Sequence, residues 1–370
     1  MKTAAVEGRE PYIIYIPVDN PVFRIVASIS ATSMSSISQA PRGYTRRELF
    51  TLGRSSSEEQ GRWIRVQRTA MACQFEILLW GDEAHHAAAA REALDEADRI
   101  ESALTVFRES SELVRVNREA ARAPVAVDEE TFGLLAQCRA LHAATERAFD
   151  ITSTPLSRCW GFLAREGRLP TAEAVEAARA IVGMEHVELD GAARTVRFSR
   201  PGVELNLGAV GKGYALGRMA TSMRARGVRD ALLSAGGSSA VAVGGRDKGW
   251  QVDIRSRRAR GPLARVRLRD GALATSGAGE QFFEKEGRRY GHVLDPRTGW
   301  PAAGTLSVSV VCADAATADA LSTAFLVGGL TLARRYCAWH PETLALVTPD
   351  DGSERPVVVG AYPGAALEEA

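Results

Sequence analysis

Residues 231–254 read ALLSAGGSSAVAVGGRDKGWQVDI. The two runs at 231–233 and 250–254 contain residues typical of β-strands, and glycine-rich segments connect them. Further β-type runs follow at 266–268, 290–294 and 306–311. Strands joined by short connections pair antiparallel, whereas a parallel sheet needs helical crossovers between its strands. The sequence therefore predicts an α+β fold with mixed, mainly antiparallel sheets flanked by helices.

The first half of the chain supplies most of the helices. Residues 63–80 are expected to form two β segments, and residues 84–104 repeat apolar side chains at the spacing of an amphipathic helix. Further helices are expected at 129–146, 171–182, 212–226, 315–327 and 330–338. Further strands are expected at 195–198 and 203–207.

We divide the 370 residues into an N-terminal arm at 1–60, one folded domain at 61–348, and a C-terminal strand and tail at 349–370. The arm contains TRRELF at 45–50, which resembles the start of a twin-arginine export signal, but a Gly/Ser/Glu stretch replaces the apolar region that should follow. The arm is therefore either a degenerate export signal or the product of a wrongly assigned start codon. Its apolar run at 12–29 is broken by polar residues, so no transmembrane segment is expected there.

Composition excludes several classes of function. Lys and Arg number 46 against 45 Asp and Glu, a balance that argues against a nucleic-acid partner, because phosphate-backbone binding needs a strong positive charge. The five cysteines include no C-x-x-C pair, which removes the sequence support for a zinc finger or a dithiol redox centre.

A glycine-rich turn at 203–214 reads VELNLGAVGKGY, a strand that runs into a turn and then a helix. Glycines allow close backbone approach, the free N–H groups at a helix start attract an anion, and Lys212 adds a positive charge. The order of glycines matches neither the Walker A loop nor the dinucleotide fingerprint. Phosphate binding and an ordinary strand-to-helix connection both remain open on this pattern.

A second segment at 313–323 reads ADAATADALST and is expected to be a helix that Asp314 caps. Asp319 and Thr323 lie four positions apart and therefore share one face of that helix. A carboxylate and a hydroxyl together suit Mg²⁺, which prefers oxygen ligands. The alternative is a solvated aspartate beside a threonine that bonds to its own helix.

A third segment at 289–299 reads RYGHVLDPRTG, a strand closed by a turn that its Asp-Pro and Thr-Gly pairs specify. His292 is either a packed or solvent-facing residue near the strand end, or an acid or base in a reaction.

In this order the segments resemble the FAD:protein FMN transferase family, also described as thiamine-biosynthesis lipoproteins or ApbE-like proteins. The resemblance covers about residues 65–345 and includes TAMA at 69–72, SSEL at 110–113 with Asn117, FDIT at 149–152, WGF at 160–162, the glycine turn, TSG at 275–277, residues 292–299 and ADALST at 318–323. It implies a single ApbE-like, T-fold-like catalytic domain.

The resemblance also implies an activity and its residues. Mg²⁺ would be held by Ala209, Asp319 and Thr323, and Asp319 or His292 would assist removal of a proton. The FMN half of the substrate FAD would pass to a Thr or Ser hydroxyl of a target flavoprotein of an electron-transfer system, with release of AMP. The implied contacts of the flavin nucleotide are Met71, Phe107, Ala148, Phe149, Asp150, Asn206, Lys212 and Val293.

Four positions depart from the family pattern, namely Asn206 for Asp, Ser238 for Asp or Asn, Phe107 for Tyr, and Ala72 for Gly. Two alternatives stay open. One is a Mg²⁺-dependent FAD pyrophosphatase, in which water replaces the acceptor hydroxyl and FMN and AMP are released, and the other is a non-catalytic FAD-binding protein, which the departures at Asn206 and Ser238 favour. No lipobox cysteine precedes the domain, so the default expectation is a cytoplasmic protein, with the periplasmic or membrane-associated placement common in the family as the alternative.

Overall fold

The computed structural model describes residues 23–24, 48–52, 63–246, 248–255, 262–279, 281–353 and 355–368. Every strand pair in these ranges is antiparallel, and helices cover one face of the largest sheet, so the predicted α+β fold is confirmed. Most of the arm predicted at 1–60 lies outside the described residues.

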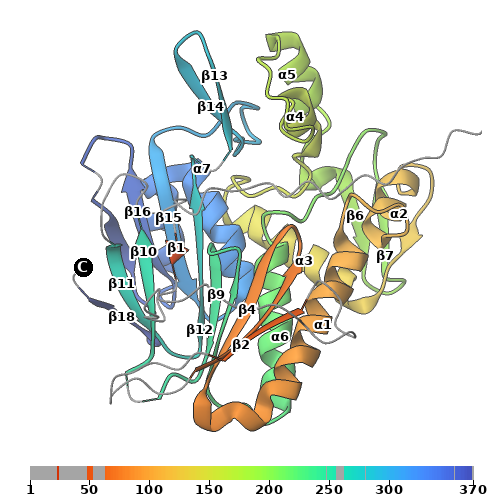
Figure 1. Ribbon diagram of the computed structural model, residues 1–370. Coiled ribbons are helices and arrows are strands. Elements are labelled where there is room, and N and C mark those ends of the chain that lie inside the picture. The colour runs from red at the N-terminus through yellow and green to blue at the C-terminus, as the bar shows by residue number, and fades with distance from the viewer. Residues whose placement is uncertain are drawn as a thin grey trace, which may run out of the picture.

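A nine-stranded sheet forms the centre of the fold (Figure 1). Its strand order is β17 (Val357–Gly360), β16 (Leu344–Pro349), β15 (Thr305–Cys312), β12 (Gly271–Gly277), β9 (Ser239–Val243), β8 (Ala231–Ala235), β4 (Cys73–Trp80), β3 (Trp63–Ala70) and β2 (Glu48–Leu52).

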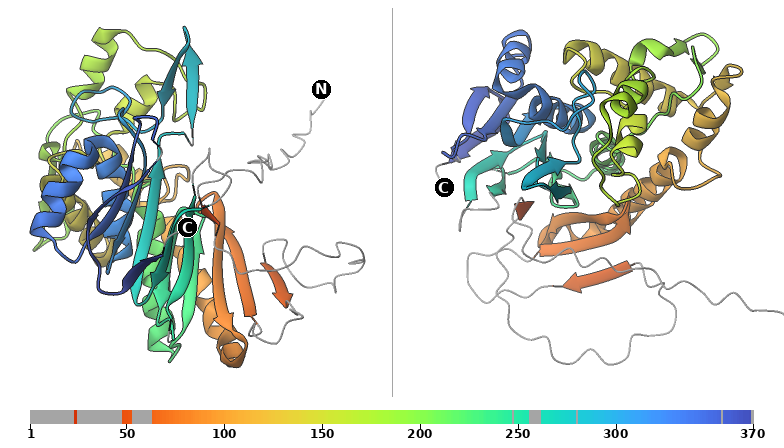
Figure 2. Two further views of the ribbon diagram at one scale, coloured as in Figure 1. Left: turned by 90° about the vertical axis from the view of Figure 1, so that its left-hand side faces the viewer. Right: turned by 90° about the horizontal axis from the view of Figure 1, so that it is seen from above.

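The central strands are buried on both faces. In β9, Val241 and Val243 pack into the core beneath the helices, whereas Ala240 and Ala242 pack into a second core on the opposite face. That opposite face is covered by a four-stranded sheet in the order β1 (Phe23–Arg24), β10 (Trp250–Arg255), β11 (Pro262–Leu268) and β18 (Ala365–Glu368). The result is three layers, a small sheet, the central sheet and a helical layer (Figures 1 and 2). Burial on both faces explains the near-continuous apolar runs of the second half of the sequence.

The helical layer and its connections contain the remaining elements. They are η1 (Gly81–His86), α1 (Ala87–Leu104), α2 (Glu112–Glu119), β5 (Val125–Ala126), α3 (Glu129–Ala144), α4 (Thr154–Cys159), α5 (Ala172–Arg179), η2 (Met184–His186), β6 (Val187–Asp190), β7 (Thr195–Phe198), α6 (Gly211–Ala225), β13 (Phe282–Lys285), β14 (Arg288–Gly291) and α7 (Ala315–Trp339). Strands β5, β7 and β6 form a three-stranded sheet, and β13 and β14 form a hairpin.

Helix α7 begins as predicted, because the Asp314 carboxylate accepts a hydrogen bond from the Thr317 N–H. It bends at Gly329, whose φ of 64° is not helical, and this bend separates the two helices predicted at 315–327 and 330–338. The helix is long and apolar enough to cross a bilayer, but 61% of its most apolar window is buried inside the protein, as in a core helix.

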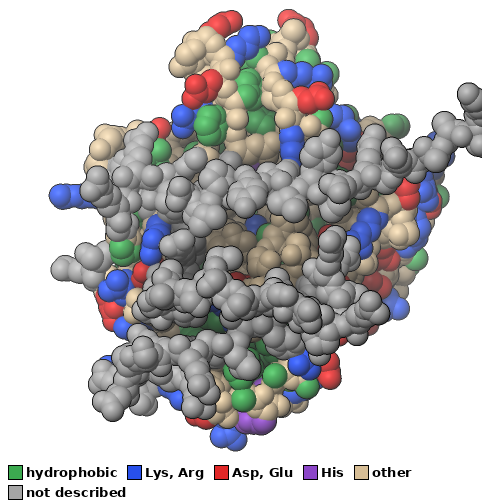
Figure 3. Space-filling model, in the orientation of Figure 1, with side chains coloured by type: hydrophobic (Ala, Val, Ile, Leu, Met, Phe, Trp, Pro, Cys, Tyr) green, Lys and Arg blue, Asp and Glu red, His purple; other side chains and the backbone are tan. Residues whose placement is uncertain are grey.

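A lobe of α4, α5, the hairpin β13–β14 and their connecting loops stands away from the central sheet (Figure 1). We call it the aromatic lobe, because its separate core is built around Trp160, with Phe162, Phe283 and Tyr290. The Trp160 Nε1–H donates to the Gly299 carbonyl at 2.8 Å, which ties the loop after β14 to this core. Acidic and basic side chains are interspersed over the lobe surface (Figure 3).

Two local strand predictions were wrong. Residues 203–207 form no strand, because the Asn117 side chain takes both backbone groups of Leu205, and the Asn206 N–H donates to the Ile151 carbonyl. The strand predicted at 290–294 ends at Gly291. The segment predicted as a C-terminal strand and tail contains β17 and β18, and β18 pairs with β11 at the edge of the smaller sheet.

The loop between β3 and β4 contains backbone strain. Ala70 pairs with Cys73, so the hairpin turns in two residues, Met71 and Ala72, which have φ values of 49° and 57°. Tight two-residue turns of this kind favour Asn and Gly, because a Cβ atom makes the left-handed region unfavourable.

We therefore expect Ala72→Gly to raise the free energy of unfolding by about 0.5–1 kcal/mol, measured by urea denaturation. Ala123→Gly is the matched control, since Ala123 is also exposed but has no positive φ, and it should lower stability. A stability of Ala72→Gly equal to or below that of the parent would contradict the assignment of strain to this turn.

Candidate functional site

The first of two adjoining cavities lies where α6, α7, β12 and the aromatic lobe meet, and the second lies between the glycine turn, the end of α1 and the turn between β3 and β4. The first has a volume of about 350 Å³ and the second about 240 Å³, and Asn206, Gly208 and Lys212 border both. Met71 and Phe107 border the second cavity. The other predicted site residues border the first cavity: Ala148, Phe149, Asp150, Asn206, Ala209, Lys212, His292, Val293, Asp319 and Thr323. The fold therefore brings every predicted site residue to one of these two cavities.

Asp319 joins the two helices at the first cavity. It is only 5% exposed, and its Oδ2 accepts the Gly213 N–H of α6 at 2.8 Å while its Oδ1 accepts the Ser239 hydroxyl of β9 at 2.9 Å. The alternative of a solvated aspartate is therefore wrong. This contact requires glycine at 213, because a Cβ there would lie 2.0 Å from the Ala315 carbonyl oxygen.

The Asp319 carboxylate caps the start of α6. Gly213 is the third residue of this helix, and the N–H groups of the first turn of a helix have no carbonyl partner within the helix. Asp319 supplies the missing acceptor for the Gly213 N–H, and Ala209, which lies two residues before the helix begins, borders the same cavity as Asp319.

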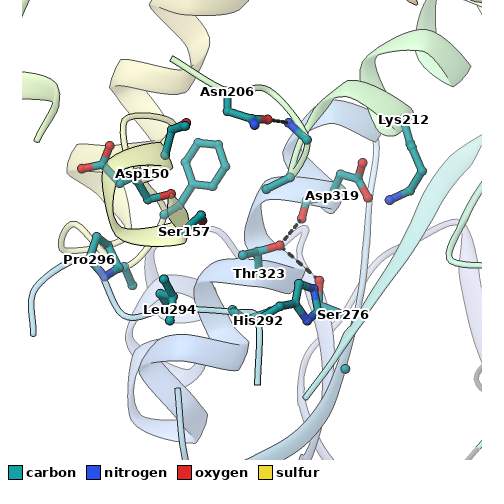
Figure 4. Close-up of a pocket in the computed structure, with 18 of the residues that line it drawn as sticks. Asp150, Ser157, Asn206, Lys212, Ser276, His292, Leu294, Pro296, Asp319 and Thr323 are labelled. Atoms are coloured by element: carbon teal, nitrogen blue, oxygen red, sulfur yellow. Dashed lines mark hydrogen bonds between the residues drawn. The ribbon is translucent and has the colours of Figure 1, made fainter. Parts of the chain in front are cut away.

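Thr323 lies one helical turn beyond Asp319 and borders the same cavity. Its hydroxyl is 3.1 Å from Ser276 Oγ and 3.5 Å from the Asp319 carbonyl oxygen, as the dashed lines of Figure 4 show. Asp319, Thr323 and Ala209 therefore border one cavity, and a carboxylate, a hydroxyl and a backbone carbonyl are the hard oxygen donors that Mg²⁺ takes. The residues present fit a magnesium ion.

The glycine turn is shaped by Asn206. Its Oδ1 accepts the Gly208 N–H at 2.8 Å, so the side-chain oxygen supports the turn. The N–H groups of Gly211 and Gly213 donate to the Leu207 carbonyl and to Asp319, so these two N–H groups at the helix start are not free for an anion. Lys212, which borders both cavities, is the remaining cationic feature of this turn for an anionic group.

His292 follows β14 directly and belongs to the first cavity. Its Nδ1 lies 3.1 Å from the Gln281 carbonyl oxygen. Because a carbonyl only accepts, a neutral imidazole in this position has its proton on Nδ1 and its acceptor lone pair on Nε2. The side chain therefore has the tautomer that a base acting through Nε2 needs.

Burial shifts the pKa values of two other ionisable groups near the site, Asp150 and Cys73. The Asp150 carboxylate accepts from the Thr152 N–H and hydroxyl at 2.8 and 2.6 Å and lies 3.3 Å from His142. Burial raises the pKa of Asp150, and His142 opposes that rise. Burial also raises the pKa of Cys73 to about 11, so this thiol stays protonated at neutral pH and is a poor nucleophile. All five cysteines are in the described part of the chain and none forms a disulfide.

Phe107 is the most accessible aromatic side chain of the site. It is 79% exposed at the second cavity, which Met71 and Val106 also border. An exposed ring beside apolar side chains suits stacking against a flat aromatic ligand.

Sequence reasoning missed Ser239, and it included Ser276 only within the TSG segment at 275–277 of the family resemblance. No spacing signal pointed to Ser239, since it lies 80 positions before its partner Asp319. A second group of potential metal ligands, Glu83, His85 and His86 of η1, borders neither cavity.

Comparison with known proteins gives a consistent set of similarities. A model of the ApbE family matches residues 71–347. A FAD:protein FMN transferase of Vibrio cholerae is 32% identical over 262 residues, which cover 69% of this chain and 78% of that protein. A FAD:protein FMN transferase of Rhodobacter capsulatus is 37% identical over 229 residues, which cover 61% of this chain and 44% of that protein. The crystal structure of the ApbE protein of Thermotoga maritima matches with a TM-score of 0.73 at 28% identity, covering 81% of this chain and 97% of that chain.

The approach of α6 to α7 can be tested with two glycines of one helix. Gly213→Ala should lower the free energy of unfolding by roughly 3 kcal/mol or more, because the new methyl group would overlap the Ala315 carbonyl. Gly217→Ala is the control one turn later, where a Cβ would meet only the Ala315 Cβ at 3.8 Å. Its stability, measured by the same denaturation assay, should rise by about 0.5–1 kcal/mol. Equal effects of the two substitutions would show that the helices are not in close contact at Gly213.

Proposed function

The chain belongs to the ApbE family, and from this membership we propose that it is a Mg²⁺-dependent transferase that moves the FMN half of FAD onto a Thr or Ser hydroxyl of a target flavoprotein. AMP is the other product. The target is a protein of an electron-transfer system.

One observation carries the proposal. Ala209, Asp319 and Thr323, each of which has an oxygen ligand to offer, border the first cavity, and Lys212 borders both cavities. These three residues are the proposed ligands of Mg²⁺. Bound there, the cation would polarise the diphosphate and stabilise the charge on the departing AMP.

The shape of the site supports one orientation of FAD. The second cavity, with Met71 and Phe107, takes the flavin ring, because its wall offers apolar side chains and an exposed aromatic ring. The first cavity, with the wall of Ala148, Phe149, Asp150 and Val293, takes the AMP half. The diphosphate then lies at the turn that both cavities share, beside Asn206 and Lys212. Each half of the substrate thus has its own cavity.

In the proposed reaction the acceptor hydroxyl oxygen attacks the phosphorus of the FMN half. A new oxygen–phosphorus bond forms, the bond from that phosphorus to the AMP phosphate breaks, and AMP leaves with the bridging oxygen. His292 takes the hydroxyl proton at Nε2, since its Nδ1 already donates to Gln281. Asp319 is the weaker base of the two candidates, because both of its carboxylate oxygens already accept hydrogen bonds.

The activity is tested by incubating the protein with FAD, Mg²⁺ and a flavoprotein domain that another family member modifies. A fluorescent acceptor band that survives denaturation is expected, and EDTA should abolish it. Asp319→Asn should lower the rate by more than the roughly 10- to 100-fold that loss of an outer-shell partner costs, because a direct ligand is removed. Circular dichroism controls for the fold, since Asn accepts only one of the two hydrogen bonds.

Three outcomes count against the proposal. FMN and AMP released at the same rate with or without acceptor would identify a pyrophosphatase, and tight FAD binding without turnover would identify a binding protein. An Asp319→Asn variant as active as the parent would remove Asp319 from the reaction.

His292→Gln tests the base. We expect the transfer rate to fall about 10²- to 10⁴-fold while FAD affinity, measured by flavin fluorescence, stays near that of the parent. A parallel loss of FAD affinity would instead assign His292 a role in binding.

A further inference from the structure

A chain of hydroxyl groups leads from Thr323 into the protein. Thr323 Oγ1 lies 3.1 Å from Ser276 Oγ, and Ser276 Oγ lies 2.8 Å from Ser322 Oγ. Ser322 in turn donates to the Asp319 carbonyl oxygen at 2.8 Å. Ser276 comes from β12, whereas the other three groups belong to α7, so the chain also joins the strand to the helix.

The last group fixes the direction of the protons in this chain. A carbonyl oxygen has no proton to give, so Ser322 must be the donor in its bond to Asp319. The Ser322 oxygen is then available to accept from Ser276, and the Ser276 oxygen is available to accept from Thr323. With its own proton directed at Ser276, Thr323 presents oxygen lone pairs rather than a proton to the cavity that it borders.

The competing arrangement, a Thr323 hydroxyl donating to its own helix, has weaker geometry. That bond would be 3.5 Å long, and the same Asp319 carbonyl already receives the Ser322 hydroxyl at 2.8 Å. A donor–acceptor distance of 3.5 Å lies beyond the usual range for hydroxyl donors, whereas 2.8 Å lies at its centre. The shorter bonds therefore favour the route through Ser276.

From this geometry we infer that Ser276 and Ser322 are positioning residues, which orient the Thr323 hydroxyl so that its oxygen can coordinate a divalent cation. The inference rests on the metal site of the proposed function and adds the groups that prepare it. Ser239 and the Gly213 N–H do the same for Asp319, where they donate to its two carboxylate oxygens. Both proposed side-chain ligands are thus held by hydrogen bonds from neighbouring elements, an arrangement that raises metal affinity.

The inference is tested by titrating Mn²⁺ into the full chain and measuring the concentration of free Mn²⁺ by electron paramagnetic resonance. Mn²⁺ replaces Mg²⁺ in this experiment because it also prefers oxygen ligands. Ser276→Ala and Ser322→Ala should each weaken Mn²⁺ binding by about 10- to 100-fold, as loss of an outer-shell partner does. Ser276→Thr keeps a hydroxyl and should restore most of the affinity.

Ser309→Ala is the matched control. Ser309 of β15 is 2% exposed, and its hydroxyl bonds to that of Thr275 at 2.6 Å. Thr275 belongs to β12, as Ser276 does, but this bond is not part of the series of hydroxyls that begins at Thr323. This variant loses a buried hydroxyl bond of the same kind, so its thermal stability should fall while its Mn²⁺ affinity stays at the parent value.

The results separate the two levels of proposal. Parent-like Mn²⁺ affinity in Ser276→Ala, together with loss of binding in Asp319→Asn, would overturn the positioning role and leave the proposed function standing. Parent-like binding in Asp319→Asn would overturn the metal site, and the positioning role with it. An equal loss in Ser309→Ala would mean that packing, and not hydroxyl orientation, controls the affinity.

Discussion

The hydrogen bond from the Gly213 N–H to the Asp319 carboxylate is the interaction on which the candidate site depends. It can form only because glycine lets the start of α6 reach the Ala315 carbonyl of α7. It holds a buried carboxylate in one orientation, and it gives an N–H of the first turn of α6 the acceptor that the helix itself does not supply. One backbone contact thus links a steric requirement, a charge and the start of a helix at the wall of one cavity.

The layers of the fold place this contact. Helices α6 and α7 pack on the same face of the central sheet, whose other face is covered by the smaller sheet. On the face that carries the helices, β9 and β12 of the central sheet bring Ser239 and Ser276 into contact with α7. Helix α7 therefore supplies the two proposed side-chain ligands, and the sheet supplies Ser239 and Ser276, two of the hydroxyls that hold them.

Local patterns in the sequence predicted much of this site. The four-residue spacing of Asp319 and Thr323 and the cap at Asp314 follow from helical geometry alone. The family resemblance added Met71 and Phe107, which no local pattern would have joined to them. Ser239 could not be predicted, because strand pairing across the sheet brings it to α7. The strand predicted at 203–207 failed because a side chain, Asn117, takes the backbone bonds of Leu205 that a neighbouring strand would have taken.

The aromatic lobe has its own small core, and the loop that contains His292 is anchored there through Gly299 and Trp160. The two proposed side-chain ligands belong instead to α7, whose residues Ala318, Ala320 and Ala324 lie in the main core. Under the proposed function, cation affinity and the placement of the proposed base would therefore depend on two separately packed regions of one chain. Sequence change on the outer surface of the lobe would then alter which acceptor proteins reach His292 while leaving the two ligands of α7 in place, which is a route by which relatives with the same proposed metal site could come to modify different proteins.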